Sequence, residues 1–392
     1  MPLIMILRFF LSLFSLMILA VTGYLLWSWY QGDFVRDGNG VLIHVRENWR
    51  LWLGLALGAW SFGGGLVVLK PLLARRDQGP IKFARGAGEI INGVNGASLY
   101  LETIGATDAP TLIFTHGWGL DSTIWAAAKR DLSESCRVIT WDLPSMGLSK
   151  APNAAVSLES FADNLAVVIK HSGAERVILI GHSIGGMTTQ TLARDHKALF
   201  DRHVAGVVLV NTTYINPLQT MILSKLALAL RFPMIEPQMH LTMWLWPLAW
   251  LSAWKSYLDG SAHIANRLGF GADVTQSQLN HTTLLSTRNP QSPQAKGNLA
   301  MFGWNATGSL GDIKVPVLAL GGDADLLTRP EASADIAAST PKGRVEIFKG
   351  AGHMGFVEQS SNYNRAIAHF VATTIAADTS RFTPQDNRKY GA

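Results

Sequence analysis

Cysteine and charge are both scarce in this sequence. Cys136 is the only cysteine in 392 residues, so no disulfide can form within the chain, and nothing in its sulfur content requires an oxidising compartment. Charged residues make up only 16% of the chain and hydrophobic residues 48%, which is apolar for a soluble protein. The composition therefore predicts an inert, buried thiol at Cys136 and a concentration of apolar residues somewhere along the chain.

Patterns typical of metal and nucleic-acid sites are absent as well. The chain has no HExxH motif and no cysteines and histidines at metal-ligand spacing, and histidines such as His240 and His263 have no partner pattern. The formal net charge is +5, but the basic residues are scattered or lie beside apolar N-terminal segments, as they do where a chain leaves a membrane. We therefore expect no metal, no other cofactor and no nucleic-acid partner.

What the chain does have is two long, uncharged apolar runs near its start. Residues 9–27 and 51–69 each come close to the roughly 20 residues that cross about 30 Å of hydrocarbon as a helix. Gly54 and Gly58 in the second run have the spacing that lets two helices approach closely. The two runs predict a hairpin of transmembrane helices.

This anchor is expected to span residues 1–72 and to continue into a basic linker over residues 73–87. A cleaved signal peptide fits the first run less well, because its apolar core is too long and no A-x-A-like cleavage site follows. Three glycines, Gly63 to Gly65, count against a helix in the second run, but its length and lack of a polar face favour a span over a buried soluble helix.

Basic residues at the ends of the two runs predict the orientation of this multi-pass protein in a cell membrane. More of them follow the second run than lie between the runs, which favours a cytosolic catalytic domain. Those after the second run are Lys70, Arg75, Arg76, Lys82 and Arg85, and those between the runs are Arg36, Arg46 and Arg50.

After Pro80, short β-branched runs alternate with amphipathic helical stretches. This alternation is typical of an α/β fold with a mostly parallel sheet covered by helices. Helical periodicity is clear over residues 158–171 and 363–376. The expected strands cover residues 98–102, 111–115, 137–141, 176–180, 204–210, 315–320 and 344–348.

One long interval interrupts the alternation before the strand that begins at residue 315. It holds about a hundred residues, too many for a simple crossover, and predicts an inserted helical cap. Its many Leu, Met and Trp residues fit an ordinary cap core, an apolar substrate cavity or a surface resting on the bilayer, and these alternatives can hold together. The expected order is a first core part at 88–211, the cap at 212–312, a second core part at 313–377 and a polar tail at 378–392.

The strongest chemical motif is Gly181-His182-Ser183-Ile184-Gly185, a G-x-S-x-G pattern between an apolar strand and a helical stretch. In this context the nucleophile occupies a strained turn, and glycines two positions away on either side avoid collisions. The turn exposes Ser183 Oγ at a helix N-terminus, where backbone N–H groups and the helix dipole stabilise developing negative charge. Ser183 is therefore the candidate nucleophile.

A serine hydroxyl needs a base to take its proton and an acid to orient that base. His353 follows the last expected strand, and loops at the carboxyl edge of a parallel sheet are where such folds build sites. Asp323 and Asp325 both lie in the loop after the penultimate strand, so either carboxylate is a candidate for the acid, whereas Asn211 is not. The chain order Ser, Asp, His is the one expected of this architecture.

With these motifs, residues 88–376 resemble the α/β-hydrolase superfamily, in its branch of cap-bearing serine esterases and monoacylglycerol lipase-like enzymes. The resemblance implies Asp325 as the acid, because the family's acid stands three residues beyond a glycine, here Gly322. It implies an oxyanion hole made by the backbone N–H groups of Trp118 and Ile184. The matching segments are His116-Gly117-Trp118-Gly119, Asp142-Leu143-Pro144, the Ser183 turn, residues 321–325 and Gly350-Ala351-Gly352-His353.

The chain departs from this family at one turn. Pro144-Ser145-Met146-Gly147 stands where many relatives have P-G-x-G, so a local difference is expected there. His116 and His182 are expected to be structural, one in a turn and one packed under the nucleophile. Because Ser183 and not an aspartate holds the nucleophile position, the resemblance argues against epoxide hydrolase or haloalkane dehalogenase chemistry.

The sequence thus predicts a membrane-anchored serine hydrolase that cleaves small-molecule or lipid-like carboxylic esters through an acyl-enzyme. A bilayer anchor and an apolar cap favour a long-chain substrate such as a monoacylglycerol. A thioesterase, amidase, acyltransferase or cofactor-free perhydrolase would use the same residues, since the fold does not choose among them. A non-catalytic membrane scaffold is the alternative of another class.

Overall fold

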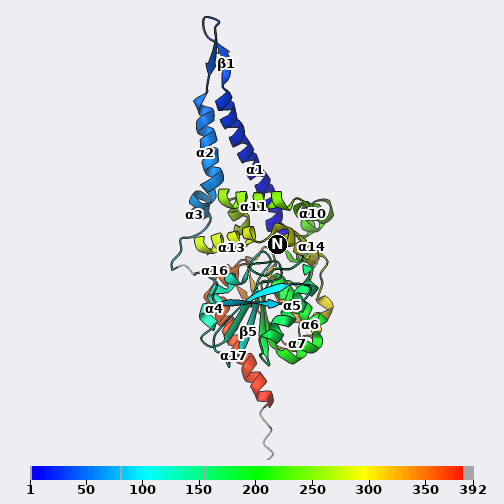
Figure 1. Cartoon of the computed structure of the whole chain (residues 1–392). Helices are drawn as coiled ribbons and strands as arrows, with labels where there is room; N and C mark the ends of the chain where they lie inside the picture. Colours follow the sequence, from blue (N-terminus) through cyan, green and yellow to red (C-terminus); the bar gives the residue numbers. More distant parts are fainter. Residues whose placement is uncertain (1, 80–81, 153–154, 383–392) are drawn as a thin grey trace, which may run out of the picture.

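A twisted, mostly parallel sheet lies at the centre of the computed structural model, which describes residues 2–79, 82–152 and 155–382 (Figure 1). Its strands follow the order β10-β9-β8-β7-β5-β6-β4-β3, and only the pairs β3–β4 and β4–β6 are antiparallel. The expected fold class, a mostly parallel sheet covered by helices, is confirmed. The strands are β3 Gly88–Asn92, β4 Ser98–Ile104, β5 Thr111–Thr115, β6 Arg137–Trp141, β7 Val177–His182, β8 Val204–Val210, β9 Val317–Gly322 and β10 Gly343–Phe348.

Each of the seven expected strands appears within about two residues of its predicted bounds, the accuracy that such boundaries allow. Three strands were not predicted. Strand β3 is at the edge of the sheet and only Ile91 in it is buried, so its sequence lacks a clear apolar run. Strands β1, Asp33–Arg36, and β2, Leu42–Val45, form an exposed antiparallel hairpin between the two N-terminal helices.

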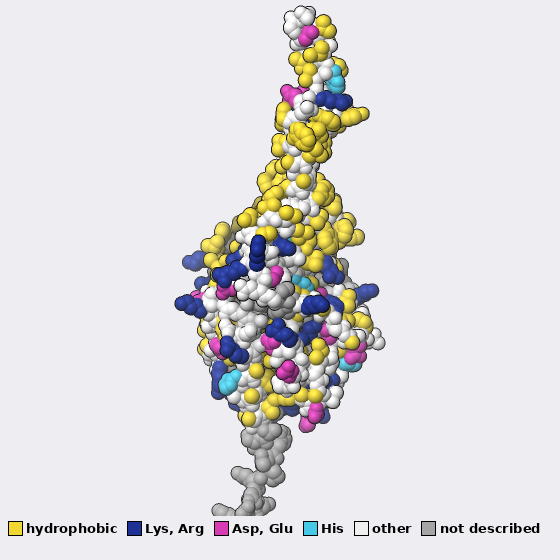
Figure 2. All heavy atoms as spheres, turned by 90° about the vertical axis from the view of Figure 1, so that its left-hand side faces the viewer, with side chains coloured by type: hydrophobic (Ala, Val, Ile, Leu, Met, Phe, Trp, Pro, Cys, Tyr) yellow, Lys and Arg dark blue, Asp and Glu magenta, His cyan; other side chains and the backbone are white. Residues whose placement is uncertain are grey.

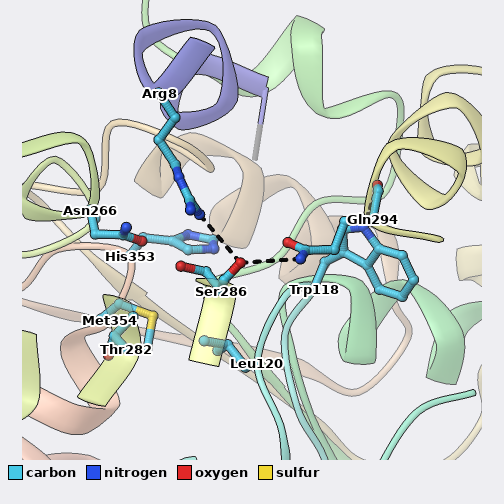
Figure 3. A pocket seen from close by; sticks show the side chains of 10 residues that line it. Arg8, Trp118, Leu120, Asn266, Thr282, Ser286, Gln294, His353 and Met354 are labelled. Atoms are coloured by element: carbon cyan, nitrogen blue, oxygen red, sulfur yellow. Dashed lines mark hydrogen bonds between the residues drawn. The ribbon is translucent and has the colours of Figure 1, made fainter. Parts of the chain in front are cut away.

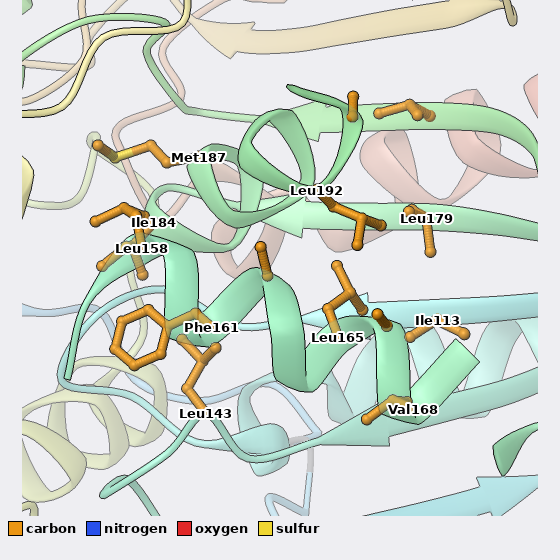
Figure 4. Packing of buried hydrophobic residues seen from close by; sticks show 14 of the residues in the cluster. Ile113, Leu143, Leu158, Phe161, Leu165, Val168, Leu179, Ile184, Met187 and Leu192 are labelled. Atoms are coloured by element: carbon orange, nitrogen blue, oxygen red, sulfur yellow. The ribbon is translucent and has the colours of Figure 1, made fainter. Parts of the chain in front are cut away.

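Helices cover both faces of the sheet. Helix α5, Leu158–His171, begins after Ser157, whose hydroxyl accepts a hydrogen bond from the Ser160 N–H at 3.1 Å. Its buried side chains recur at helical spacing and pack on the sheet beside helix α6, Ile184–Asp195 (Figure 4). Helix α15, Pro330–Ser339, shares this core, and helices α4, Ala126–Leu132, and α17, Ser360–Phe382, cover the opposite face.

The segment between β8 and β9 folds into helices that lie over the carboxyl edge of the sheet, and we call these helices the cap (Figure 1). Its residues Leu218, Met239 and Phe302 belong to a small buried core of their own. The cap helices are α8 Pro217–Thr220, α9 Ser224–Ala229, α10 Glu236–Trp244, α11 Trp246–Asp259, α12 Ser261–Arg267, α13 Gln276–Arg288 and α14 Gln291–Phe302.

Two N-terminal helices rise side by side from the cap and end in the β1–β2 hairpin (Figure 1). Helix α1 spans Pro2–Gln31, and helix α2, Asn48–Gly64, continues through a π-helical turn, Gly65–Leu69, into the short helix α3, Lys70–Leu73. By length and composition, Leu7–Gln31 and Asn48–Leu73 are apolar enough to cross a membrane. Gly54 faces α1, because a Cβ there would lie 2.9 Å from Leu26 Cδ2.

The cap end of these helices is packed against the cap. Lys255 Nζ on α11 donates to Asp259 Oδ2 and to Ser15 Oγ of α1, each at 2.8 Å, and all three side chains are buried. Gly65 approaches the α11–α12 junction so closely that a Cβ there would lie 2.2 Å from the Gly260 nitrogen. Gly65, one of the three consecutive glycines, is therefore required where the π-helical turn after α2 packs closely on the cap, and the apolar pattern alone does not indicate this contact.

The segment over residues 73–87, expected to be a basic linker, is docked where the structure describes it. The Arg75 N–H donates to the Val274 carbonyl at 2.9 Å, and Asp77 accepts a hydrogen bond from the Ser277 N–H at 3.1 Å at the start of α13. Arg85 forms ion pairs with Asp121 and Asp142 at 2.7 and 3.0 Å. Arg85 is thus held by the core and is not free to flank a membrane.

Residues 378–382, the first five of the expected polar tail, continue α17 to Phe382. The alanine-rich turn before them favours helix. Residues 383–392 lie outside the described part of the chain.

Candidate active site

Ser183 is the single residue that links β7 to α6. Its backbone has φ 52° and ψ −119°, a conformation that L-residues rarely adopt. The turn is possible only with glycine on either side. A Cβ at Gly181 would lie 2.4 Å from the Gly185 carbonyl oxygen, and one at Gly185 would lie 2.3 Å from the Thr115 oxygen. The motif glycines thus have the steric role that the sequence pattern predicts.

Neighbouring backbone and side chains hold this strained turn. The Ser183 N–H donates to the Val210 carbonyl of β8 at 3.0 Å, and Thr212 Oγ1 donates to the Ser183 carbonyl at 2.6 Å. The Gly186 N–H donates to the same carbonyl at 2.9 Å. These hydrogen bonds fix the backbone of Ser183 from both sides at the start of α6.

His353 lies between β10 and helix α16, Gly355–Glu358, and its ring is almost fully buried. Its Nδ1 lies 2.9 Å from Asp325 Oδ2 and 3.2 Å from Thr328 Oγ1. Its Nε2 is buried, and no described residue hydrogen-bonds to it. Ser183 and His353 line the same small cavity, although His353 Nε2 makes no hydrogen bond to Ser183 Oγ in this conformation.

Asp325 sits in a dense set of donors. Leu327 N–H and Thr328 N–H donate to Oδ1 at 2.8 and 2.9 Å, while Thr328 Oγ1 and Asn211 Nδ2 donate to Oδ2 at 2.8 and 3.0 Å. Burial alone would raise the pKa of Asp325, but the field of His353 and these hydrogen bonds outweigh it and hold the pKa below its usual value. The carboxylate that meets His353 is therefore ionised at neutral pH.

Asp323, the other candidate for the acid, points elsewhere. Its side chain is exposed and accepts a hydrogen bond from the Gly350 N–H at 2.6 Å, in the loop that leads to His353. Of the two carboxylates, only that of Asp325 contacts the imidazole among the described residues.

Two polar residues beside this pair were not predicted as part of the site. Asn211, at the carboxyl end of β8, donates to Asp325 and to the Gly352 carbonyl, and its own Oδ1 accepts from the Tyr363 hydroxyl at 3.1 Å. Thr328 bridges Asp325 and His353. Asn211 had a usable signal, a polar residue directly after a buried strand at the site edge of the sheet, whereas nothing in the sequence distinguishes Thr328.

The two expected oxyanion donors belong to different elements of the fold. Ile184 is the first residue of α6, and Trp118 lies in the turn after β5. The Trp118 ring is held by its Nε1–H, which donates to the Gln294 carbonyl of the cap at 2.8 Å, and by contact with Phe161 at 5.4 Å between centroids. These contacts anchor the turn that carries the Trp118 backbone N–H.

The two motif histidines pack around the turn. His116 Nδ1–H donates to the Gly117 carbonyl at 2.8 Å, and Nε2 accepts from the Leu143 N–H at 2.9 Å, so the ring braces the Trp118 turn. His182 Nε2–H donates to the His353 carbonyl at 3.1 Å. Burial lowers the pKa of both rings, and proximity to His353 lowers that of His182 further. Both positions suit neutral, structural imidazoles.

The turn at Pro144-Ser145-Met146-Gly147 keeps the conformation that glycine would favour. Ser145 adopts φ 67° and Gly147 φ 56°, and a Cβ at Gly147 would lie 2.2 Å from Asp142 Oδ2. The serine therefore takes a left-handed backbone at some cost in free energy, on the order of 1 kcal/mol.

A second cavity of about 40 Å³ meets His353 from the cap side, between the cap and the N-terminal end of α1 (Figure 3). Arg8, Trp118 and Gln294 line it together with Leu120, Asn266, Gly269, Thr282, Ser286 and Met354. In this conformation it is large enough for a few waters only. Among the described residues, no three His, Cys, Asp or Glu side chains gather as metal ligands.

Comparison with known proteins agrees with this architecture. A family model described as alpha/beta hydrolase fold matches residues 110–360. The chain is 25% identical over 294 residues to an uncharacterised protein of Mycobacterium tuberculosis, covering 70% of this chain and 78% of that one. It is 25% identical over 271 residues to a pimeloyl-(acyl-carrier protein) methyl ester esterase of Vibrio vulnificus, covering 67% and 94%.

Solved structures extend this likeness to three dimensions. An esterase from Exiguobacterium antarcticum matches with a TM-score of 0.61 at 19% identity and covers 73% of this chain and 100% of its own. At that identity the match concerns the fold alone, whereas the family match covers well over half of the chain. The chain therefore belongs to the α/β hydrolase family.

Proposed function

We propose that this protein is a membrane-anchored serine hydrolase that cleaves carboxylic esters through an acyl-enzyme. The observation that carries the proposal is the hydrogen bond of 2.9 Å between His353 Nδ1 and Asp325 Oδ2 beside a cavity that Ser183 also lines. The methyl ester esterase among its relatives points to the same chemistry.

In the proposed reaction, His353 Nε2 takes the hydroxyl proton as Ser183 Oγ attacks the ester carbonyl carbon. The carbonyl oxygen gains negative charge and is stabilised by the backbone N–H groups of Trp118 and Ile184. Collapse of this intermediate breaks the bond to the alcohol, which leaves with the proton from His353. Water then attacks the acyl-enzyme with His353 as base, releasing the acid and restoring the serine.

Asp325 has a separate part in this scheme. Its ionised carboxylate accepts the Nδ1–H, which leaves Nε2 free to accept the serine proton, and it stabilises the imidazolium that forms. Asn211 and Thr328 act as positioning residues, because they hold the carboxylate and do not reach the reacting atoms.

The anchor is proposed to be a two-span hairpin of α1 and α2. Apolar side chains cover this hairpin and the part of the domain from which it rises, and Lys and Arg side chains gather below them (Figure 2). From Ser15, where α1 meets the cap, to Gln31 the helix is about 24 Å long, less than the roughly 30 Å of hydrocarbon. A spanning hairpin would therefore bring the cap into the bilayer surface.

The outer face of the cap suits that position. Trp244, Trp246 and Trp250 at the α10–α11 junction are half or more exposed, as are Leu248 and Leu251. Tryptophan rings favour the headgroup level of a bilayer, so this face supports a cap that rests on the membrane and admits a lipid-like ester from it. The same side chains in water would form an unusually apolar surface.

Chain-length dependence tests the substrate class. With p-nitrophenyl esters from acetate to decanoate, kcat/KM of the full-length protein in nanodiscs is expected to rise by roughly tenfold or more, since each methylene that leaves water contributes about 0.8 kcal/mol. A fall along the series contradicts a lipid-like acyl group. Thioester, amide and alcohol-acceptor versions of the best acyl chain separate an esterase from a thioesterase, an amidase and an acyltransferase.

Topology is tested with paired reporters. Without Arg85, four basic residues still follow the second span against three in the loop, so a cytosolic catalytic domain remains the expectation. A fluorescent reporter after Ala392 should be active in the cytosol, and alkaline phosphatase inserted at Asn39 should be active outside it. The opposite pattern of reporter activity would place the catalytic domain outside the cytosol. Release of the protein from membranes by a carbonate wash would show that the two helices do not span the bilayer.

A further inference from the structure

Helix α1 does more than anchor the domain, since it places a guanidinium in the cavity beside His353 (Figure 3). Arg8 Nη1 lies 3.5 Å from the Ser286 carbonyl oxygen of α13, at the outer limit of a hydrogen bond. That oxygen already accepts a hydrogen bond from Gln294 Nε2 at 3.1 Å. The contact is therefore a weak partner for a group with five N–H donors.

No carboxylate of the described residues forms an ion pair with Arg8. The side chains that line the cavity with it are uncharged or, in His353, an imidazole already hydrogen-bonded to Asp325. The buried carboxylate of Asp259 on nearby α11 is held by Lys255, Ser15 and Ser261. A guanidinium in a partly enclosed cavity without a counter-ion is costly, and an anion arriving with a ligand would remove that cost.

The direction of the side chain is also informative. Arg8 is the basic residue at the start of the apolar stretch of α1, where an arginine beside a bilayer ordinarily extends toward lipid headgroups. Here it turns inward to the cavity that meets the proposed base (Figure 3). A planar guanidinium in that place matches a carboxylate or phosphate, which it can bind through two parallel hydrogen bonds.

We propose that Arg8 forms an anion subsite, and that the substrate is an ester bearing a carboxylate or phosphate group in the portion that occupies the cap cavity. This inference rests on the proposed ester hydrolysis and names its substrate class. The shared chemistry is an oxyanion with two or more equivalent oxygens. It can come from the far end of a soluble dicarboxylic monoester or from the headgroup of a phosphate-bearing lipid.

Two matched substrate pairs test the subsite on the full-length protein in nanodiscs. The soluble pair is monomethyl adipate and methyl hexanoate, and the lipid pair is 1-decanoylglycerol 3-phosphate and 1-decanoylglycerol. The wild type is expected to prefer the anionic member of at least one pair, which identifies the source of the anion. Arg8→Gln should lower the ratio of anionic to neutral kcat/KM by about 10- to 100-fold, the effect of a charge-assisted hydrogen bond, and Arg8→Lys should restore part of it.

Arg76→Gln is the matched control, because it removes one positive charge from an exposed position outside the cavity and should leave that ratio unchanged. If Arg8→Gln lowers both members of each pair equally, Arg8 only fastens α1 to the cap and the subsite is refuted. A wild-type preference for both neutral esters refutes it as well.

A binding measurement separates this inference from the proposed function. Quenching of tryptophan fluorescence in Ser183→Ala protein by adipate or glycerol 3-phosphate should weaken at least tenfold when Arg8→Gln is added, since Trp118 lines the cavity. Arg8-dependent binding without hydrolysis of any ester would uphold the subsite and refute the esterase. Hydrolysis of the neutral esters without any Arg8-dependent binding would uphold the esterase and refute the subsite.

Discussion

Replacement of Ser183 by alanine should lower kcat on the best ester by about 10⁵-fold or more while leaving the fold intact. Only the hydroxyl group is lost, and alanine keeps the helix start and the packing of the turn. Its removal eliminates the covalent path, so what remains is the modest acceleration from substrate binding and the oxyanion donors. Active-site labelling with a fluorophosphonate should disappear with the same substitution.

Ser145→Gly provides a matched control for that experiment. Ser145 is another mostly buried serine with a positive φ, at 67°, and glycine there removes a hydroxyl and relieves the backbone together. Its labelling and kcat should stay within about twofold of the wild type, as expected for a substitution away from the chemistry. Absence of labelling in folded wild-type protein would favour a non-catalytic membrane scaffold over the proposed hydrolase.

The positions of seven strands along the chain and the position of Ser183 could be predicted from the sequence, because each produces a short, recognisable pattern. Parallel strands such as β7 and β8 are buried on both faces, so each is a short apolar run with a clear beginning and end. Glycines at 181 and 185 report a backbone approach that no other residue permits. Each of these patterns lies within a few consecutive residues, although the clash that requires glycine at 185 is with the distant Thr115.

Features that depend on distant parts of the chain were not predictable in the same way. Arg8 is 345 positions before His353, and only the packing of α1 on the cap brings the two residues to one cavity. Nothing in the sequence distinguishes Thr328 from other loop threonines, and its role depends on the fold, which brings Asp325 and His353 within hydrogen-bonding distance of it. Arg85 was assigned to the membrane flank by its position in the chain, whereas its partners Asp121 and Asp142 lie in loops after β5 and β6.

Substitution of Asp325 by asparagine is expected to lower kcat by about 10⁴-fold, because the amide no longer selects the imidazole tautomer with Nδ1–H and a free Nε2. Shape and volume hardly change, so the substrate KM should move little. The informative comparison is Asp323→Asn, whose exposed carboxylate contacts Gly350 and not His353. Its kcat should remain within about threefold of the wild type, since a surface substitution away from the chemistry has small effects.

The acid stability of the two variants should differ as well. The folded pKa of Asp325 is depressed, so its ionisation stabilises the fold above the unfolded pKa, near 3.9, and this contribution is lost as pH falls through the folded pKa. Between neutral pH and about pH 4, Asp325 should therefore contribute little to the pH dependence of the free energy of unfolding. Below that range the wild type and Asp323→Asn should lose stability more steeply than Asp325→Asn, because only they retain the Asp325 carboxylate, which must take up a proton.

The kinetic comparison can also contradict the assignment of the acid. Equal losses of kcat in the two asparagine variants would show that the reaction does not require the hydrogen bond between Asp325 and His353. A larger loss of kcat in Asp323→Asn would assign the role of the acid to Asp323.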